Sequence, residues 1–475
     1  MSDLDLANLT ITRAARALRA KELSAIELAD AYLRRIEQLN PRVNAYVTVS
    51  AERAREDAKR ADAELAAGKA RGPLHGIPIA HKDLYGTAGI RTTAGSKIYA
   101  SHVPAADCTV ARKLREAGTV LLGKLNTHEY AYGVTTDNPH FGATHNPWKL
   151  DCIPGGSSGG SGAAIAAGLA TAVTGTDTGG SIRIPASLCG VVGLKPTYGR
   201  VSKAGVFPLS YAFDHAGPLT RTVEDAALML NAIAGYDAAD PASVRAPVDD
   251  VTANLAAGVR GLRVGVPRGA FFERVDDEVA AAIERALAEL ARLGAQLREI
   301  EIAGVAEAVG GLFGFVRAEA QQIHAQTLRD RPGDIGADVR ALLESPAPDA
   351  AGLMAGLRAR DALTAAMRSA LESVDVLVTP TTPAAAVRIG QDSARIGESD
   401  EPVIAAMIRC TAPFNATHLP ALSLPCGFTR AGLPIGLQIA GRPFDEATVL
   451  RAGHAYEQAT DWHTRTPALR GGDVL

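Results

Sequence analysis

The sequence predicts an α/β fold built on a large, mostly buried sheet. Short apolar segments bounded by glycine and proline recur along the chain, and each has the length of a buried strand. Segments of helical character separate them, so strand and helix patterns alternate over most of the length. The expected strands are 76–80, 119–123, 190–194, 263–266, 376–379, 421–425 and 437–440.

Helices are expected before the first of these strands, from about residue 10 to residue 70. Ser24–Glu27 is a capping-box pattern that begins a helix, and Asn40-Pro41 is expected to stop it. A second, highly charged helix should run from about 51 to 67, with its charges on a solvated face.

We expect one large domain covering residues 1–475, although the length alone would favour two or three. The polar patch 237–251 is too short to mark a clear linker. We distinguish a helical region of about 1–70, a catalytic core of about 71–240, a less well defined region of about 241–400, and closing strands and a helix at about 401–475. In the third region, 262–302 has a β-α-β pattern that forms an insertion or the far edge of the sheet, and three helical stretches between 305 and 374 should cover one face.

Composition argues against several classes of function. The net charge of −3 and the pI near 6.4 do not indicate a nucleic-acid surface. The first residues lack the pattern of a signal peptide, and no apolar run is long enough to span a bilayer. The five cysteines form no C-x-x-C pair, and the 11 histidines form no H-x-x-x-H pattern. We therefore expect a cytoplasmic protein with buried thiols, no metal, no cofactor, and no nucleic-acid or membrane partner; a homodimer stays open as an assembly.

The chain is organised around residues 153–185, which contain two glycine-flanked serine sites. The Ala-rich segment between them, 162–173, is predicted to be a buried helix because it has almost no polar side chain. A phosphate-binding loop is disfavoured, since no lysine follows the glycines. A nucleophile elbow with Ser158 remains an alternative, but it leaves the second serine site unexplained. A flexible linker does not fit the apolar segments that follow closely.

The same stretch resembles the signature of the amidase signature family. The run G-G-S-S-G-G-S at 155–161 is followed by an Ala/Gly-rich segment and by D-T-G-G-S-I-R-I-P at 177–185, and G-I-P-I-A-H-K-D lies upstream at 76–83. The order and spacing of these motifs match the family pattern. Weaker similarity continues at 193–197, 217–221 and 432–438. The resemblance implies the amidase signature fold, in which helices cover both faces of a large mixed central sheet.

The resemblance implies a catalytic set of Ser181, Ser157 and Lys82. Ser181 is the expected nucleophile, Ser157 is a proton relay preceded by a cis peptide bond, and Lys82 is the base. Burial at the end of an apolar strand would lower the pKa of Lys82 toward the working pH. The neighbouring Asp83 could instead pair with a lysine and keep it protonated.

Other residues near Ser181 are expected to support it. Successive N–H groups of Thr178, Gly179, Gly180 and Ser181 form a prospective oxyanion hole. Ser158 should support the loop by hydrogen bonds, and Asp177 and Arg183 should fix its shape. Binding of an acidic substrate by Arg183 is the alternative. A Ser-His-Asp set is the competing hypothesis for the nucleophile; its candidate histidines are His81, His128, His145 and His215, the last preceded by Asp214.

The sequence therefore predicts an enzyme that hydrolyses a small-molecule carboxamide through an acyl-enzyme. The alternatives are a carbamate- or ester-cleaving relative and the glutaminase component of a tRNA-dependent amidotransferase. Residues 201–209 depart from the pattern of that component, where a tyrosine precedes the glycine, and this favours a free-standing amidase. A silent binding protein is disfavoured by the intact catalytic set. The resemblance places pocket-lining residues near 130–134, 207–209, 312–317 and 417–421, which are mostly apolar and aromatic and favour aliphatic or aryl amides.

Overall fold

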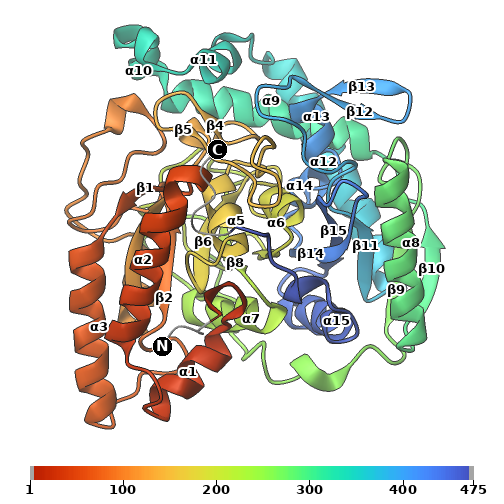
Figure 1. Cartoon of the computed structure of the whole chain (residues 1–475). Helices are drawn as coiled ribbons and strands as arrows, with labels where there is room; N and C mark the ends of the chain where they lie inside the picture. The colour runs from red at the N-terminus through yellow and green to blue at the C-terminus, as the bar shows by residue number, and fades with distance from the viewer. Residues whose placement is uncertain (1–4, 470–475) are drawn as a thin grey trace.

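The computed structural model describes residues 5–469, and within them an 11-stranded mixed sheet crosses the molecule (Figure 1). Its middle strands, from β6 to β11, pair antiparallel. Parallel pairs lie toward both ends, and β1 closes one edge in antiparallel fashion. In sheet order the strands are β1 (Tyr46–Val49), β3 (Val120–Leu125), β2 (Pro78–Lys82), β6 (Ala172–Asp177), β8 (His215–Thr220), β7 (Val192–Lys195), β14 (Ala421–Phe428), β15 (Pro434–Gly441), β11 (Val376–Pro380), β9 (Arg263–Pro267) and β10 (Gln296–Ile300).

Helices cover both faces of this sheet. In strand β15, a side chain at Gly436 would meet Ser187 of α6, whereas one at Gly441 would meet Val449 of α15. Positions an odd number of residues apart in a strand point to opposite faces, so α6 and α15 lie on opposite sides. The helices are α1 (Ile11–Arg19), α2 (Ala25–Val43), α3 (Ala51–Ala66), α4 (Thr109–Glu116), α5 (Gly159–Ala166), α6 (Arg183–Cys189), α7 (Val223–Ile233), α8 (Asp277–Arg292), α9 (Val305–Ile323), α10 (Ala325–Asp330), α11 (Ala337–Glu344), α12 (Ala350–Ser373), α13 (Val403–Ile408), α14 (Ala412–Ala416) and α15 (Glu446–Gln458). Two small hairpins, β4 (Asp137–Asn138) with β5 (Gly142–Ala143) and β12 (Ser393–Ile396) with β13 (Ser399–Pro402), lie outside the main sheet.

The capping box at the start of α2 is confirmed, but the expected end of that helix is wrong. Ser24 Oγ accepts the N–H of Glu27 at 3.2 Å, and the Glu27 carboxylate accepts the N–H of Ser24 at 2.9 Å. The helix continues through Pro41 to Val43 and ends at Asn44, which adopts a left-handed conformation with φ 49°. A proline in the last turn removes one hydrogen bond without ending the helix.

The predicted helix over 162–173 is corrected by the structure. Helix α5 ends at Ala166, and strand β6 begins at Ala172. Gly168 adopts φ +66° and stops the helix, because the N–H groups of Gly168 and Leu169 turn back onto the carbonyls of Ile165 and Ala164. The alanine-rich composition hid this boundary, since Ala172 and Val173 are as apolar as the helix before them.

The β-α-β pattern at 262–302 forms the far edge of the sheet. Strands β9 and β10 pair in parallel, with α8 between them in the chain. Between 305 and 374 there are four α-helices, α9 to α12, where three were expected; α9 and α12 pack along each other. In Figure 1 this group occupies the upper part of the molecule, with α10 and α11 farthest from the sheet.

The five cysteines are free and buried, as expected. Within residues 5–469, no helix is both long enough and apolar enough to cross a membrane.

Candidate active site

The three predicted catalytic residues come together at one edge of the sheet, where two neighbouring parallel strands end. Lys82 is the last residue of β2, and Ser181 lies four residues beyond the end of β6. Ser157 lies just before helix α5, which packs against both strands. Carboxyl ends of adjacent parallel strands meet at one edge of a sheet, and this is where α/β proteins usually place their sites.

Lys82 is fully buried among hydroxyl groups. Its Nζ donates to Ser157 Oγ at 2.7 Å and to Thr176 Oγ1 at 2.8 Å. Burial disfavours the ammonium form and lowers the pKa of Lys82 to about 7, although Asp214 and Asp177 oppose this change. An amine with this pKa is partly neutral near neutral pH and can then accept a proton.

Ser157 is held by its own backbone. The Gly156–Ser157 peptide bond is cis, as the resemblance implies. The carbonyl of Ser157 accepts hydrogen bonds from Thr127 Oγ1 at 2.9 Å and from the N–H of His128 at 3.1 Å. These contacts fix the loop and leave the Ser157 hydroxyl directed at Lys82.

Ser158 joins the two serine loops. Its N–H donates to the carbonyl of Ser181 at 3.2 Å. Its hydroxyl donates to the carbonyl of Thr176 at 3.2 Å and accepts the N–H of Thr176 at 3.3 Å. Ser158 is therefore bound to the end of β6 and to the Ser181 loop at once.

The segment Thr178–Ser181 presents backbone N–H groups without partners. Within residues 5–469, none of these four N–H groups donates a hydrogen bond to the protein. Gly180 adopts φ +140°, and a Cβ there would lie 2.3 Å from Thr411 Oγ1, so only glycine fits. The Thr411 hydroxyl in turn donates to the carbonyl of Gly179 at 2.6 Å. Free N–H groups in a fixed turn are suited to bind a negative oxygen.

Asp177 and Arg183 form a buried ion pair beneath this segment. Arg183 donates to Asp177 through Nε at 3.0 Å and Nη2 at 2.9 Å, and its remaining N–H groups bind Thr411, Asn415 and Gln438. Burial would raise the pKa of Asp177, but the guanidinium outweighs it and lowers this pKa to about 2. All five donors of Arg183 are used. This favours the structural interpretation of Arg183 over binding of an acidic substrate.

The candidate histidines have other partners. The Ser158 hydroxyl bonds the backbone of Thr176 on both sides, and none of the hydrogen bonds described within residues 5–469 joins it to a histidine. The structure therefore gives no support to a Ser-His-Asp set on Ser158. The partners are Thr174 for His81, Asp338 for His128, Leu150 for His145 and Phe213 for His215.

Asp83 does not pair with the catalytic lysine candidate. Its carboxylate lies 3.5 Å from the Nζ of Lys124 on strand β3 and accepts the N–H of Thr93 at 2.9 Å. Sequence reasoning missed Thr176, the second partner of Lys82, and also Asn415 and Thr411. Thr176 could have been found because it lies in the same strand as Asp177. Thr411 and Asn415 lie more than 200 residues from Arg183 in the chain, and no local pattern marks them.

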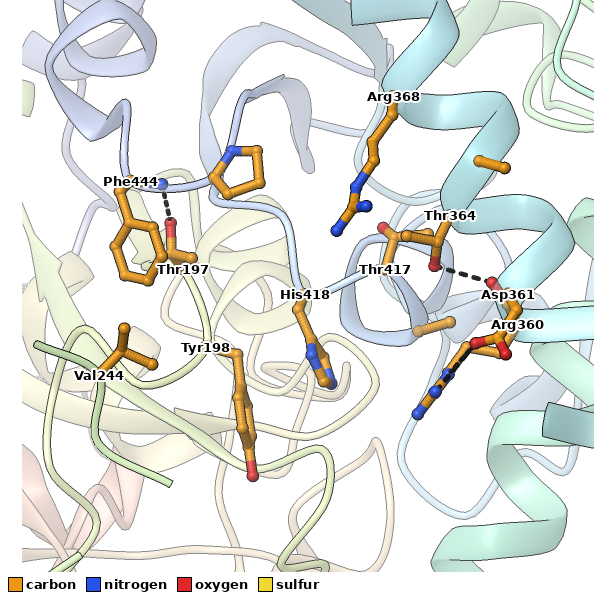
Figure 2. A pocket seen from close by; sticks show the side chains of 13 residues that line it. Thr197, Tyr198, Val244, Arg360, Asp361, Thr364, Arg368, Thr417, His418 and Phe444 are labelled. Atoms are coloured by element: carbon orange, nitrogen blue, oxygen red, sulfur yellow. Dashed lines mark hydrogen bonds and ion pairs between the residues drawn. The ribbon is translucent and has the colours of Figure 1, made fainter. Parts of the chain in front are cut away.

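Several hollows lie near the site or farther out, and one of about 530 Å³ is lined by Tyr132, Gly133 and Val134 from the expected segment 130–134. A cavity of about 890 Å³ reaches Thr176 and is lined by Phe207 and Pro208, as expected for 207–209. An apolar cavity of about 320 Å³ is lined by Phe313 from the expected segment 312–317. A surface groove of about 500 Å³ lies farther out, between α12 and Tyr198, and the three predicted catalytic residues are not part of its lining (Figure 2).

Comparison with known proteins identifies the class of this site. The Amidase family matches residues 27–450, and the chain therefore belongs to the amidase family. It is 45% identical over 469 residues to an amidase of Pseudomonas putida, covering 98% of this chain and 99% of that protein. It is 43% identical over 492 residues to the A subunit of the glutamyl-tRNA(Gln) amidotransferase of Geotalea daltonii, covering 98% and 100%. A structure described as a vestigial protein complex that reveals the evolutionary origins of an s-triazine catabolic enzyme superposes with a TM-score of 0.91 at 34% identity, covering 95% of this chain and 98% of that chain. The protein is thus an amidohydrolase of the amidase signature type.

Proposed function

We propose that this protein is a free-standing amidase that cleaves a carboxamide C–N bond through an acyl-enzyme on Ser181. The observation that carries the proposal is the contact of a buried Lys82 Nζ with Ser157 Oγ at 2.7 Å, beside a segment of unpartnered N–H groups. Neutral Lys82 accepts the proton of Ser157, Ser157 accepts that of Ser181, and the Ser181 oxygen attacks the amide carbon.

The next steps use the same groups. The N–H groups of Thr178–Ser181 stabilise the oxyanion of the tetrahedral intermediate. The proton returns from Lys82 through Ser157 to the departing nitrogen, the C–N bond breaks, and an ester of Ser181 remains. Water then attacks the ester, losing its proton along the same path, and the acid is released with Ser181 restored. The proton that leaves with the amine is replaced by one from the attacking water, so the three residues end the cycle in their starting protonation states.

An uncharged acyl group is supported by the surface that faces the oxyanion segment. A side chain at Gly179 would lie 3.1 Å from the Phe313 ring and 4.0 Å from Ile408, so these two apolar side chains lie directly against it. In the adjoining cavity, Arg274 pairs with Glu401 at 3.1 Å and Arg409 donates to two backbone carbonyls. Both arginines of this cavity are therefore engaged, and burying the carboxylate of an amino acid without a free cation would be costly. Aliphatic or aryl amides therefore fit better than glutamine.

The glutaminase component of a tRNA-dependent amidotransferase remains the second candidate, favoured by the 43% identity to the protein of Geotalea daltonii. The purified chain should be assayed alone on simple aliphatic and aryl amides, carbamates, esters and glutamine. Turnover of an uncharged amide without tRNA or partner supports the proposal. Glutamine hydrolysis that appears only when partner proteins and tRNA are added would reject it.

The nucleophile is tested by Ser181→Ala. This variant should lose turnover and covalent labelling by a fluorophosphonate, with its melting temperature close to that of the wild type. Ser158→Ala is the matched control, because it removes a hydroxyl from the same site and should still be labelled. Peptide mapping that finds the label on Ser158 of the wild type would overturn the assignment.

A further inference from the structure

Asp214 carries a carboxylate that the proposed catalytic set does not use. It precedes β8, and its neighbour His215 pairs with Asp177 across the sheet. Its Oδ2 accepts the N–H groups of Leu209 at 2.8 Å and Ser210 at 3.0 Å. Its Oδ1 accepts the hydroxyl of Thr178 at 2.5 Å. The carboxylate is thus fixed on one side by a loop and holds a threonine on the other.

The threonine is the first residue of the oxyanion segment. Thr178 connects β6 to the two glycines that precede Ser181, and glycines are the most flexible residues of the backbone. The bond to Asp214 fixes the side of the segment that faces β8, while Thr411 holds the carbonyl of Gly179 on the other side. Correct placement of the free N–H groups depends on both anchors.

Asp214 is also a charge near the proposed base. Strand β6 separates the two: Thr176 of this strand accepts the Lys82 ammonium at 2.8 Å, and Thr178 binds Asp214. Burial has the largest effect on the pKa of Lys82 and lowers it. Among the groups that raise this pKa, Asp214 has the largest effect and Asp177 the next. Asp177 is neutralised in large part by its bidentate pair with Arg183.

We propose that Asp214 is a positioning residue, which anchors the oxyanion segment through Thr178 and supplies the negative charge that acts on Lys82 across strand β6. This assignment rests on the proposed function. Asp214 is not itself a reacting group, because its contacts are Thr178 and two backbone N–H groups. It acts on the placement of the oxyanion segment and on the charge of Lys82.

The other charged groups around Asp214 are satisfied elsewhere. Lys203 donates to the Tyr198 hydroxyl at 3.2 Å and to the carbonyl of Tyr211 at 2.9 Å, and no ion pair within 4 Å links it to Asp214 in the described residues. Glu319 accepts the hydroxyl of Ser210 and the N–H of Ala212, the second at 3.4 Å, and a glutamine oxygen there can accept both bonds. The remaining charged or titratable groups that line the same cavity are Asp240, Tyr198, Tyr211 and His215, and His215 contacts the carbonyls of Phe213 and Asp177. Burial is the largest effect on the pKa of Asp214 and raises it, while Lys203 and the hydrogen bonds from Thr178, Ser210 and Leu209 act in the opposite direction.

Two variants separate the two parts of the proposal. In Asp214→Asn the side-chain oxygen satisfies the N–H groups of Leu209 and Ser210, and the amide NH₂ faces the Thr178 hydroxyl, which can accept as well as donate. The charge is lost and the hydrogen bonds are kept. In Thr178→Val the anchoring hydroxyl is lost and the charge is kept; Thr178→Ser restores the hydroxyl. Glu319→Gln is the matched control, because it removes a carboxylate from the same cavity without acting on Lys82.

The measurement is kcat and kcat/KM against pH on the best uncharged amide, with melting temperatures for every variant. For Asp214→Asn the acidic limb of kcat/KM should move to lower pH, while Glu319→Gln leaves the limb in place. For Thr178→Val kcat should fall by about tenfold to a hundredfold, while the acidic limb of kcat/KM stays at the wild-type pH. Thr178→Ser should recover most of the lost kcat.

The outcomes are distinguishable. A folded Asp214→Asn enzyme whose limb stays at the wild-type pH overturns the charge role. A kcat of Thr178→Val within about twofold of wild type overturns the anchoring role, and this variant keeps the test decisive if Asp214→Asn does not fold. If Lys82→Ala leaves the acidic limb of the wild type intact, the proposed function itself fails, and that result is seen before any Asp214 variant is made.

Discussion

Two buried lysines on adjacent strands show why only one of them suits proton transfer. Lys82 on β2 and Lys124 on β3 are both fully buried, and Lys124 sits opposite the neighbour of Lys82, His81. Lys124 Nζ donates to the carbonyl of Tyr85 at 2.6 Å and to Thr92 Oγ1 at 2.6 Å, and it lies 3.5 Å from the Asp83 carboxylate. Lys82 has two hydroxyl partners, and among the residues that the structure describes no carboxylate forms an ion pair with it.

The difference lies in what the partners can do when the lysine loses its proton. A hydroxyl can donate as well as accept, so Ser157 and Thr176 can satisfy a neutral amine. A carbonyl only accepts, and a carboxylate beside the amine favours the ammonium. Burial lowers the pKa of both lysines, and at Lys124 the Asp83 carboxylate is the foremost group opposing it. We infer that Lys124 has a structural role and that Lys82 can titrate.

The largest expected effect is on catalysis at Lys82. Lys82→Ala should lower kcat/KM by at least about 10³-fold and remove the acidic limb that we expect for the wild type near pH 7, because no other group accepts the proton there. Lys82→Arg should be about as inactive, since a guanidinium holds its proton at every accessible pH. Steady-state kinetics from pH 5 to 9 measures both.

Thermal melting must show that both variants fold. An arginine variant that folds and keeps a substantial share of the wild-type rate would mean that Lys82 acts by a fixed positive charge, and the relay through Ser157 would be wrong.

The matching change at Lys124 should act on stability. Lys124→Met leaves the Asp83 carboxylate buried without its cation, and breaking a buried pair in this way costs about 3–5 kcal/mol of unfolding free energy. Urea denaturation followed by circular dichroism measures the loss. The double variant Asp83→Asn with Lys124→Met should recover part of it, because the uncompensated charge is gone.

The folded fraction of Lys124→Met should keep an acidic limb at the wild-type pH. A limb that moves, with stability unchanged, would reverse the two roles inferred for these lysines.

The sequence allowed the arrangement of the proposed catalytic residues to be predicted better than the side chains that support them. The contact between Lys82 and Ser157 could be predicted because both residues lie in short motifs whose order and spacing match the family pattern. The boundary between α5 and β6 was wrong, since alanine and valine are equally apolar in either element. The groups that bind Arg183, such as Asn415, could not be predicted, because nothing local marks a partner 232 residues away.

The last prediction concerns two buried acids, Asp225 and Glu457, which resemble Lys82 in being buried without an ion pair in the described residues. Burial is the main cause that raises the pKa of Asp225 and of Glu457 to about 8, and each has one carboxylate oxygen without a hydrogen-bond partner in the described residues. As at Lys82, no residue between 5 and 469 forms an ion pair with either acid, so the neutral form is favoured.

A raised acid pKa means that the folded state holds protons that the unfolded state has released. Stability is therefore highest below about pH 4 for these two groups and falls as the pH rises toward 8, by about 1.4 kcal/mol per pH unit for each group. Asp225→Asn keeps an acceptor for the N–H of Ile11, which Asp225 Oδ1 now binds at 2.9 Å, and cannot ionise. Urea denaturation between pH 6 and 8.5 should show a smaller slope in this variant, while Asp361→Asn, which removes an exposed carboxylate on α12, should keep the wild-type slope. Equal slopes in all three proteins would show that Asp225 is ionised in the folded state, and burial without a contacting counter-charge would then not be sufficient to keep a group neutral in this fold.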